Sequence, residues 1–268
     1  KGSWFLRYQS EGHSRFPRCQ DIPPEGFWTA DEFESMQRLI LTVAISYCWL
    51  HYVHPDPQGD HFQTLCHALR LRLDVTGPAR VEDIAFFLDY CSLPQEGEVG
   101  DRNSPLRGQE RTPEEKISFG KGLQQVNIPY AHQLVDMWML KWTPPGEQRT
   151  YMDRGWPFFE QGVASLIKDA FRLYDLQHGV HYDSWLRVHD LSTKERQAPL
   201  TPNEFVQALK CKSLTNGKKD LSILESKYEE TFNEVVGGAT ELLFSGLGWG
   251  DQEAVQLTLL FPFALCLE

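Results

Sequence analysis

The stretch LTVAISYCW, residues 41–49, decides the fold. It is rich in β-branched side chains, and its apolar character is nearly uninterrupted. A strand that is covered on one face alternates apolar and polar residues, whereas a strand buried on both faces does not. The stretch therefore predicts an interior strand of a parallel sheet.

Two more apolar runs predict neighbouring strands. VEDIAFFLDYCSLPQ spans residues 81–95, and a third run begins at residue 134 and continues to residue 143. Helical spacing separates the runs over residues 61–73 and 113–126 and follows them over 156–173; Thr112 is a candidate cap of the middle helix. Strand, loop and helix repeated three times predict an α/β domain with a central parallel sheet and right-handed crossovers.

The carboxyl ends of these strands predict where a ligand binds, because ligands of open parallel sheets sit beyond those ends. The side chains expected there are Ser46, Tyr47, Trp49, Asp89, Ser92, Gln95 and Thr143. The segment YMDRGWPFFEQGVASLI, residues 151–167, follows the third strand on the same rim. It brings together Arg154, Trp156 and Glu160, although a Trp and two Phe at a helix start are more often core than site.

Composition limits the class of protein. The 268 residues are 41% hydrophobic, enough for one large domain or one domain with an extension, and the net charge of −11 argues against nucleic acid and anionic membranes as partners. The apolar runs 39–50 and 257–267 are too short to span a bilayer. Six dispersed cysteines without a CxxC pair, and first residues unlike a signal peptide, predict reduced, buried thiols in a cytoplasmic protein.

The remaining segments suggest four parts: an extended arm over 1–38, the α/β domain over 39–197, a helical linker over 198–240 and a terminal unit over 241–268. Residues 96–113 are expected to form an exposed polar loop, and residues 180–191 a last short strand. In the linker, Thr201, Pro202 and Glu204 predict a helix start, and Gly237 and Gly238 close a second helix. The terminal unit is expected to hold a strand, a glycine turn and an amphipathic helix.

The order of Ser46-Tyr47, FLDYCSLPQ and RGWPFFE resembles the Toll/interleukin receptor (TIR) domain. That family has a flavodoxin-like parallel sheet with helices on both faces, and it carries a Trp-Cys-x-x-Glu motif. Here the motif is residues 156–160, with Pro157 in place of Cys. The chain also resembles a multi-domain family of protists and algae in which a TIR-like module precedes leucine-rich repeats. Residues 242–268 are similar to the first such repeat, a cap that exposes Leu257, Leu260, Phe261 and Phe263 until a neighbour covers them.

The resemblance implies that the domain binds NAD as a substrate and cleaves its nicotinamide–ribose bond, as an NAD glycohydrolase of a signalling or defence protein. Glu160 takes the catalytic role, and the cofactor-binding residues are Ser46, Tyr47, Trp49, Asp89, Ser92, Gln95, Arg154 and Trp156. The alternative is a non-catalytic scaffold that assembles homo-oligomers through the TIR-like domain and binds proteins through its repeats. Arg154 then forms a salt bridge with Glu160 or Asp153.

A metal site is a third interpretation, although no metal is expected. His54, Asp56, Asp60 and His61 form one His/Asp group, and His178, His181, Asp183 and His189 form another. Neither group has a known ligand spacing.

Overall fold

The computed structural model describes residues 1–97, 110–192 and 196–267. The chain divides into two compact units. The first comprises residues 1–45, 49–126 and 178–185, and the second comprises residues 46–48, 127–177 and 186–268. Most of the polar loop expected over residues 96–113 lies outside the described residues. No described helix is both long and apolar enough to cross a bilayer.

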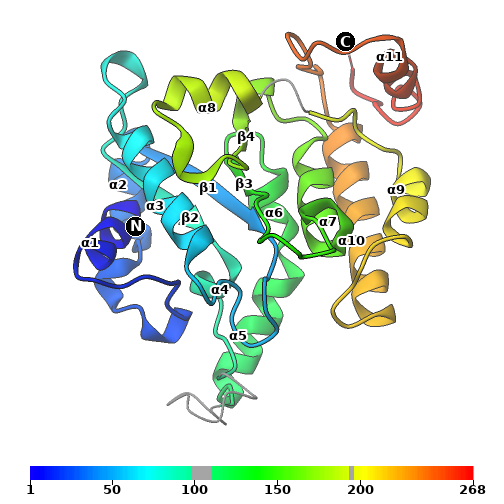
Figure 1. Cartoon of the computed structure of the whole chain (residues 1–268). Helices are drawn as coiled ribbons and strands as arrows, with labels where there is room; N and C mark the ends of the chain where they lie inside the picture. Colours follow the sequence, from blue (N-terminus) through cyan, green and yellow to red (C-terminus); the bar gives the residue numbers. More distant parts are fainter. Residues whose placement is uncertain (98–109, 193–195, 268) are drawn as a thin grey trace. The chain divides into compact units, whose positions relative to one another are not determined.

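The fold is α/β with a parallel sheet, as predicted. The strands are β1 (Ile40–Tyr47), β2 (Asp83–Phe87), β3 (Asp136–Leu140) and β4 (Leu173–Asp175). Their order is β2-β1-β3-β4 (Figure 1). Ile40 of β1 is in register with Asp83 of β2, and Met137 of β3 is in register with Leu173 of β4. An order that runs 2-1-3-4 is compatible with a flavodoxin-like sheet.

Burial explains the uninterrupted apolar runs. Val43, Ala44 and Ile45 of β1 are fully buried, and all five residues of β3 are buried. A strand with side chains covered on both faces has no solvent face on which polar residues would alternate.

The first unit holds the helices around β1 and β2. They are α1 (Gly2–Ser10), α2 (Ala30–Met36), α3 (Asp60–Leu73), α4 (Asp89–Ser92) and α5 (Pro113–Gln124), with single turns at Cys19–Asp21, Pro24–Gly26, Gly77–Ala79 and Gly179–His181. The Thr112 side chain accepts from Glu115 N, and Pro113 is the first residue of α5, so the predicted cap is confirmed. Gly59 precedes α3 with φ +81°, and an added Cβ there would lie 1.8 Å from Ser14 O.

The expected extended arm is wrong at its beginning, where the chain forms α1. Ser3 donates through N and Oγ to the Asp83 carboxylate of β2, at 2.8 and 2.6 Å. The buried Phe5 ring packs edge-on against Phe86 with centroids 4.7 Å apart. Tertiary packing of two aromatic residues therefore stabilises a nine-residue helix that would be marginal alone.

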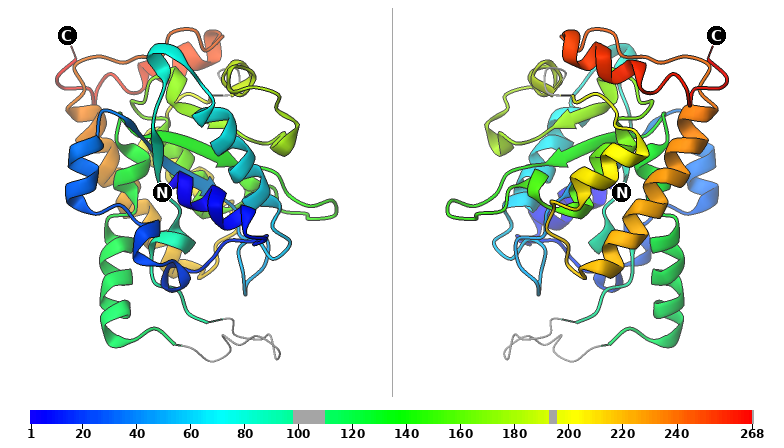
Figure 2. Two further views of the ribbon diagram at one scale, coloured as in Figure 1. Left: turned by 90° about the vertical axis from the view of Figure 1, so that its left-hand side faces the viewer. Right: turned by 90° about the vertical axis from the view of Figure 1, so that its right-hand side faces the viewer.

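The second unit holds β3, β4 and the remaining helices. They are α6 (Asn127–Ala131), α7 (Gly155–Ala164), α8 (Trp185–Ser192), α9 (Pro202–Leu209), α10 (Lys218–Gly237) and α11 (Asp251–Thr258), with turns at Tyr151–Asp153 and Ala170–Arg172. The first residue of α8, Trp185, belongs to the first unit. The predicted caps are confirmed: Thr201 and Glu204 form the capping box of α9, and α10 ends at Gly237. Helix α9 lies beside α10 (Figure 2, right), and both pack on α7.

Two strand predictions are wrong. The short strand expected within residues 180–191 is replaced by helix α8. The fourth strand is β4, which begins at Leu173, the last residue of the helix expected over residues 156–173. Helix α7 ends at Ala164, so the chain is free to return to the sheet at Leu173. Residues 173–175 form a strand because they pair with β3, and the periodicity of a single segment does not reveal such pairing.

The terminal unit also differs from the expected repeat cap. Residues 241–250 contain no strand, and α11 follows them. A repeat strand needs a neighbouring strand as hydrogen-bond partner. Leu260, expected to be exposed, is fully buried, and the Phe263 ring packs edge-on against Phe232 of α10 at 5.2 Å. This segment therefore uses α10 as its support.

The six cysteines are free thiols, as predicted, but they are not all buried. Cys48, Cys66 and Cys91 are buried, whereas Cys211 and Cys266 are exposed.

Candidate functional site

Ser46 lies near the carboxyl end of β1 and is fully buried. Its Oγ donates to Glu160 Oε2 at 2.5 Å and lies 2.5 Å from the Tyr151 hydroxyl. All three residues belong to the second unit. The end of a strand thus meets a turn and a helix that lie more than one hundred residues later in the chain.

Glu160 is carried by α7, whose beginning is fixed by the chain around Ser213. Ser213 N donates to Asp153 O at 2.8 Å, and Gly155 N donates to Ser213 O at 2.9 Å. An added Cβ at Gly155 would lie 2.1 Å from Leu214 Cδ2, so a glycine permits this close approach. These contacts set the direction in which α7 leaves the turn, and hence the position of Glu160 five residues later.

The direction of the hydrogen bonds follows from proton counting. A hydroxyl has one proton to donate, and the Ser46 hydroxyl donates its hydrogen bond to Glu160. The hydrogen bond between Tyr151 and Ser46 is therefore donated by Tyr151. Burial, followed by the nearby charge of Glu160, raises the pKa of Tyr151 well above its ordinary value. The phenol therefore keeps the proton that it donates. A charge-assisted chain Tyr151–Ser46–Glu160 results.

All three members of this chain are buried. Glu160 retains 8% of its surface exposed, whereas Ser46 retains 0% and Tyr151 2%. The Ser46 hydroxyl contacts the carboxylate directly, and the Tyr151 hydroxyl contacts Ser46. A negative charge held this way is a group that can stabilise a developing positive charge.

A second charged pair lies at the ends of β3 and β4. Lys141 follows β3, and its Nζ lies 2.7 Å from Asp175 Oδ2, at the last residue of β4. Asp175 is buried, and its charge is one of the lesser causes that raise the pKa of Tyr151. The carboxyl ends of three strands therefore contribute polar side chains to this region of the second unit.

Arg154 directly precedes α7 and pairs with a loop carboxylate. Its Nη2 lies 3.5 Å from Glu147 Oε2, a partner other than the two expected from the sequence. Burial raises the pKa of the Cys48 thiol, and Arg154 is the largest influence opposing that rise. The guanidinium is therefore near Cys48, the residue that follows β1.

Tyr47 and Trp156 are placed in packed surroundings. Tyr47 is buried at the last position of β1. The Trp156 indole donates through Nε1 to Asp220 Oδ2 of α10 at 3.2 Å and packs edge-on against Phe159. The Trp156 ring thus ties α7 to α10, which is a structural use of the motif.

The other predicted binding residues form a local cluster in the first unit. Trp49 packs edge-on against Tyr90, and Asp89 Oδ1 accepts from Tyr90 N at 2.6 Å. Ser92 Oγ accepts from Leu88 N. The buried Gln95 donates through Nε2 to the carbonyls of Asp89 and Leu93, which closes the loop after β2 on itself. This hydrogen bonding shapes the loop whether or not it binds a ligand.

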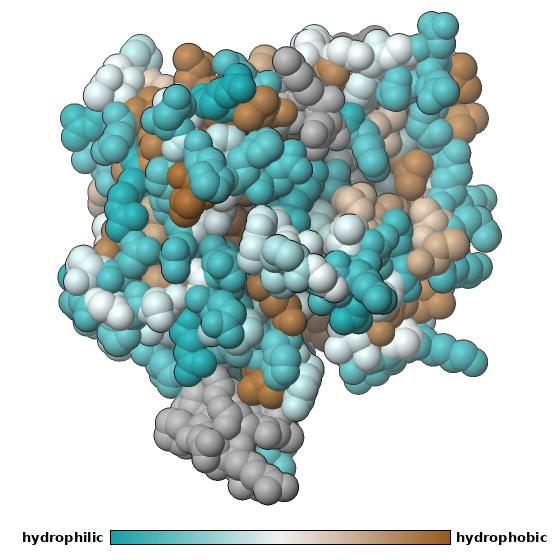
Figure 3. Space-filling view, viewed as in Figure 1, coloured by the Kyte–Doolittle hydropathy of each residue, from teal (hydrophilic) through white to brown (hydrophobic). Residues whose placement is uncertain are grey.

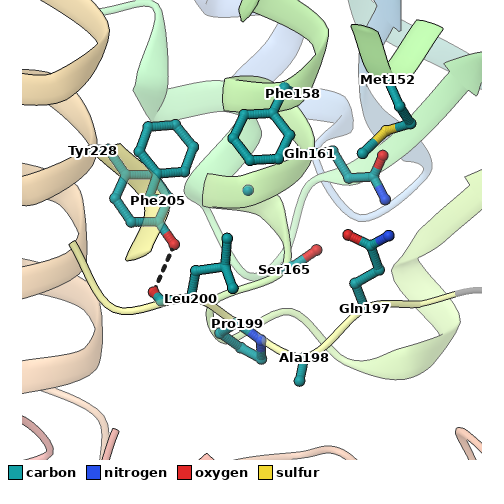
Figure 4. Close-up of a pocket in the computed structure, with 11 residues that line it drawn as sticks. Met152, Phe158, Gln161, Ser165, Gln197, Ala198, Pro199, Leu200, Phe205 and Tyr228 are labelled. Carbon is teal, nitrogen blue, oxygen red and sulfur yellow. Dashed lines mark hydrogen bonds between the residues drawn. The ribbon is translucent and has the colours of Figure 1, made fainter. Parts of the chain in front are cut away.

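A small cavity lies beside α7. Phe158, Phe205 and Tyr228 form its stacked aromatic wall, and Gln161, Ser165 and Gln197 add polar groups (Figure 4). Its volume of about 20 Å³ suits one water molecule rather than a nucleotide. Ser46, Tyr151 and Glu160 do not line it.

The two His/Asp groups have structural partners. His54 Nδ1 accepts from Asp56 N, and Asp56 Oδ2 accepts from Phe62 N at 2.8 Å near the start of α3. The His189 ring stacks on Phe171 at 4.9 Å. Within the described ranges no group of three His, Cys, Asp or Glu side chains has a geometry that could hold a metal ion.

Sequence reasoning missed three members of the region around Glu160: Tyr151, Lys141 and Asp175. Tyr151 opens the segment that drew attention to Glu160, so its proximity in sequence was an available signal. Lys141 and Asp175 depend on the pairing of β3 with β4, which the sequence did not reveal. No protein-family model, curated protein or solved structure matches this chain significantly.

Proposed function

We propose that this chain binds NAD and cleaves its nicotinamide–ribose bond, with Glu160 as the catalytic carboxylate. The observation that carries the proposal is the chain of hydroxyls from Tyr151 through Ser46 to Glu160 Oε2 at the end of β1. Open parallel sheets bind ligands beyond the carboxyl ends of their strands. The place of Glu160 beside the end of β1 and its hydrogen bond from Ser46 support the proposal.

Cleavage of this bond requires the protein to stabilise one developing charge. As the bond to nicotinamide breaks, electrons leave with the ring and positive charge develops on the ribose carbon and ring oxygen. A fixed carboxylate that stabilises this charge more than the ground state lowers the barrier. Ser46 orients the carboxylate, and Tyr151 fixes the Ser46 proton. Arg154 is a candidate partner for the NAD phosphates, because a guanidinium matches phosphate geometry.

A non-catalytic scaffold is the second candidate, and the surroundings of α7 favour it. Phe158 stacks on Phe205 at 5.0 Å, and Trp156 bonds to Asp220, so the aromatic residues beside Glu160 pack against α9 and α10. In this case the Ser46–Glu160 bond is a structural tie between β1 and α7. A TIR-like fold that carries exposed apolar surface would then serve assembly.

Nicotinamide release by the purified chain distinguishes the two functions. Wild type should release nicotinamide from NAD, and Glu160→Gln should not. Glu229→Gln, which changes an exposed carboxylate on α10, is the matched control and should behave as wild type. An inactive wild type across NAD concentrations would favour the scaffold.

A further inference from the structure

Exposed apolar side chains are concentrated at the end of the described chain. Five of them form the C-terminal apolar surface: Val255, Leu259, Phe261, Phe263 and Leu265. Leu265 is 82% exposed, Val255 63% and Phe261 53%. Figure 3 shows apolar groups at the upper right, over the region where Figure 1 places α11. Large contiguous apolar patches mark interaction sites.

This surface is held in a defined conformation. Leu260, between its exposed neighbours, is fully buried, and the Phe263 ring edge rests on Phe232 of α10. Gln256 Nε2 of α11 donates to Glu204 Oε2 of α9 at 2.8 Å. The exposed side chains are therefore presented on a supported segment, which lowers the entropy cost of binding.

The charged residues of the surrounding sequence are acidic, although the Arg196 guanidinium of the preceding segment lies over the Phe244 ring at 5.0 Å. Residues 228–267 contain six acidic residues and no Lys, Arg or His. Glu241 and Asp251 are exposed. Asp251, Val255 and Leu259 are spaced at intervals of four, so they lie on one face of α11. The acidic Asp251 is at the N-terminal end of this face, and the apolar Val255 and Leu259 follow it.

We propose that the C-terminal apolar surface docks a basic amphipathic helix of a partner protein. An apolar face of such a helix would cover Phe261 and Leu265, and its Lys and Arg side chains would meet Glu241 and Asp251. A second copy of this chain is disfavoured because it would bring the same acidic residues together, and an anionic membrane is disfavoured for the same reason. Residues 241–267 contain no strand, so strand addition is excluded, and an apolar stripe beside exposed acidic residues suits an amphipathic basic helix.

The test uses two synthetic 18-residue helical peptides with the same leucine face, one with lysines and one with glutamates on the polar face. Fluorescence anisotropy measures their binding to the full chain. The double variant Phe261→Ser, Leu265→Ser removes the apolar contacts, and Glu241→Lys, Asp251→Lys reverses the charge. Leu186→Ser, at a residue that is 69% exposed on α8, is the matched control.

The lysine peptide should bind saturably, and both double variants should weaken it at least tenfold while Leu186→Ser does not. Added salt should weaken it as well, because surface charges are screened. Circular dichroism verifies that each variant is folded, and the charge reversal keeps the test decisive if the serine variant is not. Equal binding of the glutamate peptide, unchanged affinity in the folded variants, or absence of saturable binding would overturn the proposal. Sedimentation showing a wild-type dimer that Leu265→Ser abolishes, without peptide binding, would assign the surface to a second copy.

Discussion

Ser46 Oγ and Glu160 Oε2 lie 2.5 Å apart although 114 positions separate the two residues in the sequence. This hydrogen bond joins the carboxyl end of the first strand to the helix that follows the third. It gives a buried carboxylate an oriented partner, and Tyr151 orients that partner in turn. The same contact therefore links β1 to α7 and orients the carboxylate of the proposed chemistry.

The Tyr151 hydroxyl should be required for the geometry of Glu160. Tyr151→Phe keeps the ring but removes the donor to Ser46, and one such buried bond is worth about 1 kcal/mol of unfolding free energy. We expect a melting temperature a few degrees lower and, if the protein is an NAD glycohydrolase, a lower kcat with a nearly unchanged KM. Calorimetry and steady-state kinetics measure the two effects. A Tyr151→Phe variant that matches wild type in both would show that the hydroxyl chain has no role.

Substitution of Gly162 should destabilise the packing behind the site. A Cβ there would lie 3.1 Å from ring carbons of both Phe205 and Tyr228, which are stacked 3.6 Å apart and have little room to move. Gly162→Ala should cost about 1–3 kcal/mol of unfolding free energy, as overpacking typically does. The measurement is chemical denaturation.

Gly120→Ala is the matched control for that substitution. Gly120 also lies inside a helix, but an added Cβ would meet no atom within 4 Å. Alanine should therefore stabilise α5 by up to about 1 kcal/mol. If Gly162→Ala were as stable as Gly120→Ala, the tight packing of α7 against α9 and α10 would be wrong.

Lys168 should make stability depend on pH. Burial lowers its pKa from 10.5 to about 7, although the Asp136 charge opposes the shift. Its Nζ donates to His132 O and Val135 O. Between about pH 7 and 10.5 the unfolded chain binds the extra proton, so the unfolding free energy should rise with pH in this window.

Lys168→Met removes the titrating group. Its unfolding free energy should be lower overall, because two carbonyls lose their donor, and it should rise less with pH over the same window. Urea denaturation at several pH values compares the two slopes. Parallel slopes for wild type and variant would contradict the buried, desolvated ammonium.

The sequence predicted the parallel sheet because burial on both faces leaves a direct trace, the unbroken run around Val43. It predicted the beginnings of α5 and α9 because capping is local, as at Thr112 and Thr201. It failed where distant contacts decide: at α1, which depends on Phe86 and Asp83, and at β4, which depends on β3.

The candidate site shows the same difference between what local sequence patterns predict and what distant contacts decide. Glu160 and Ser46 were singled out from their expected place at the strand ends and from a resemblance in motif order, and the structure brings them together. Trp156 was expected to bind the cofactor; its indole donates to Asp220, a partner 64 positions away that no local pattern indicates. Asp89, Ser92 and Gln95 belong to a segment that is held by its own hydrogen bonds and by two bonds between Gln95 and Gln20, and Trp49 packs against Tyr90 of that segment.

The central claim is tested most directly by nicotinamide release from NAD, measured for wild type and Glu160→Gln alongside their melting temperatures. Glutamine keeps an oxygen that accepts from Ser46 but loses the charge that favours the cationic transition state. One such interaction is worth about 3–4 kcal/mol, so turnover should fall a hundredfold or more while the melting temperature and NAD affinity change little. Unchanged turnover in Glu160→Gln, or an inactive wild type whose melting temperature drops on the substitution, would contradict the catalytic role of Glu160.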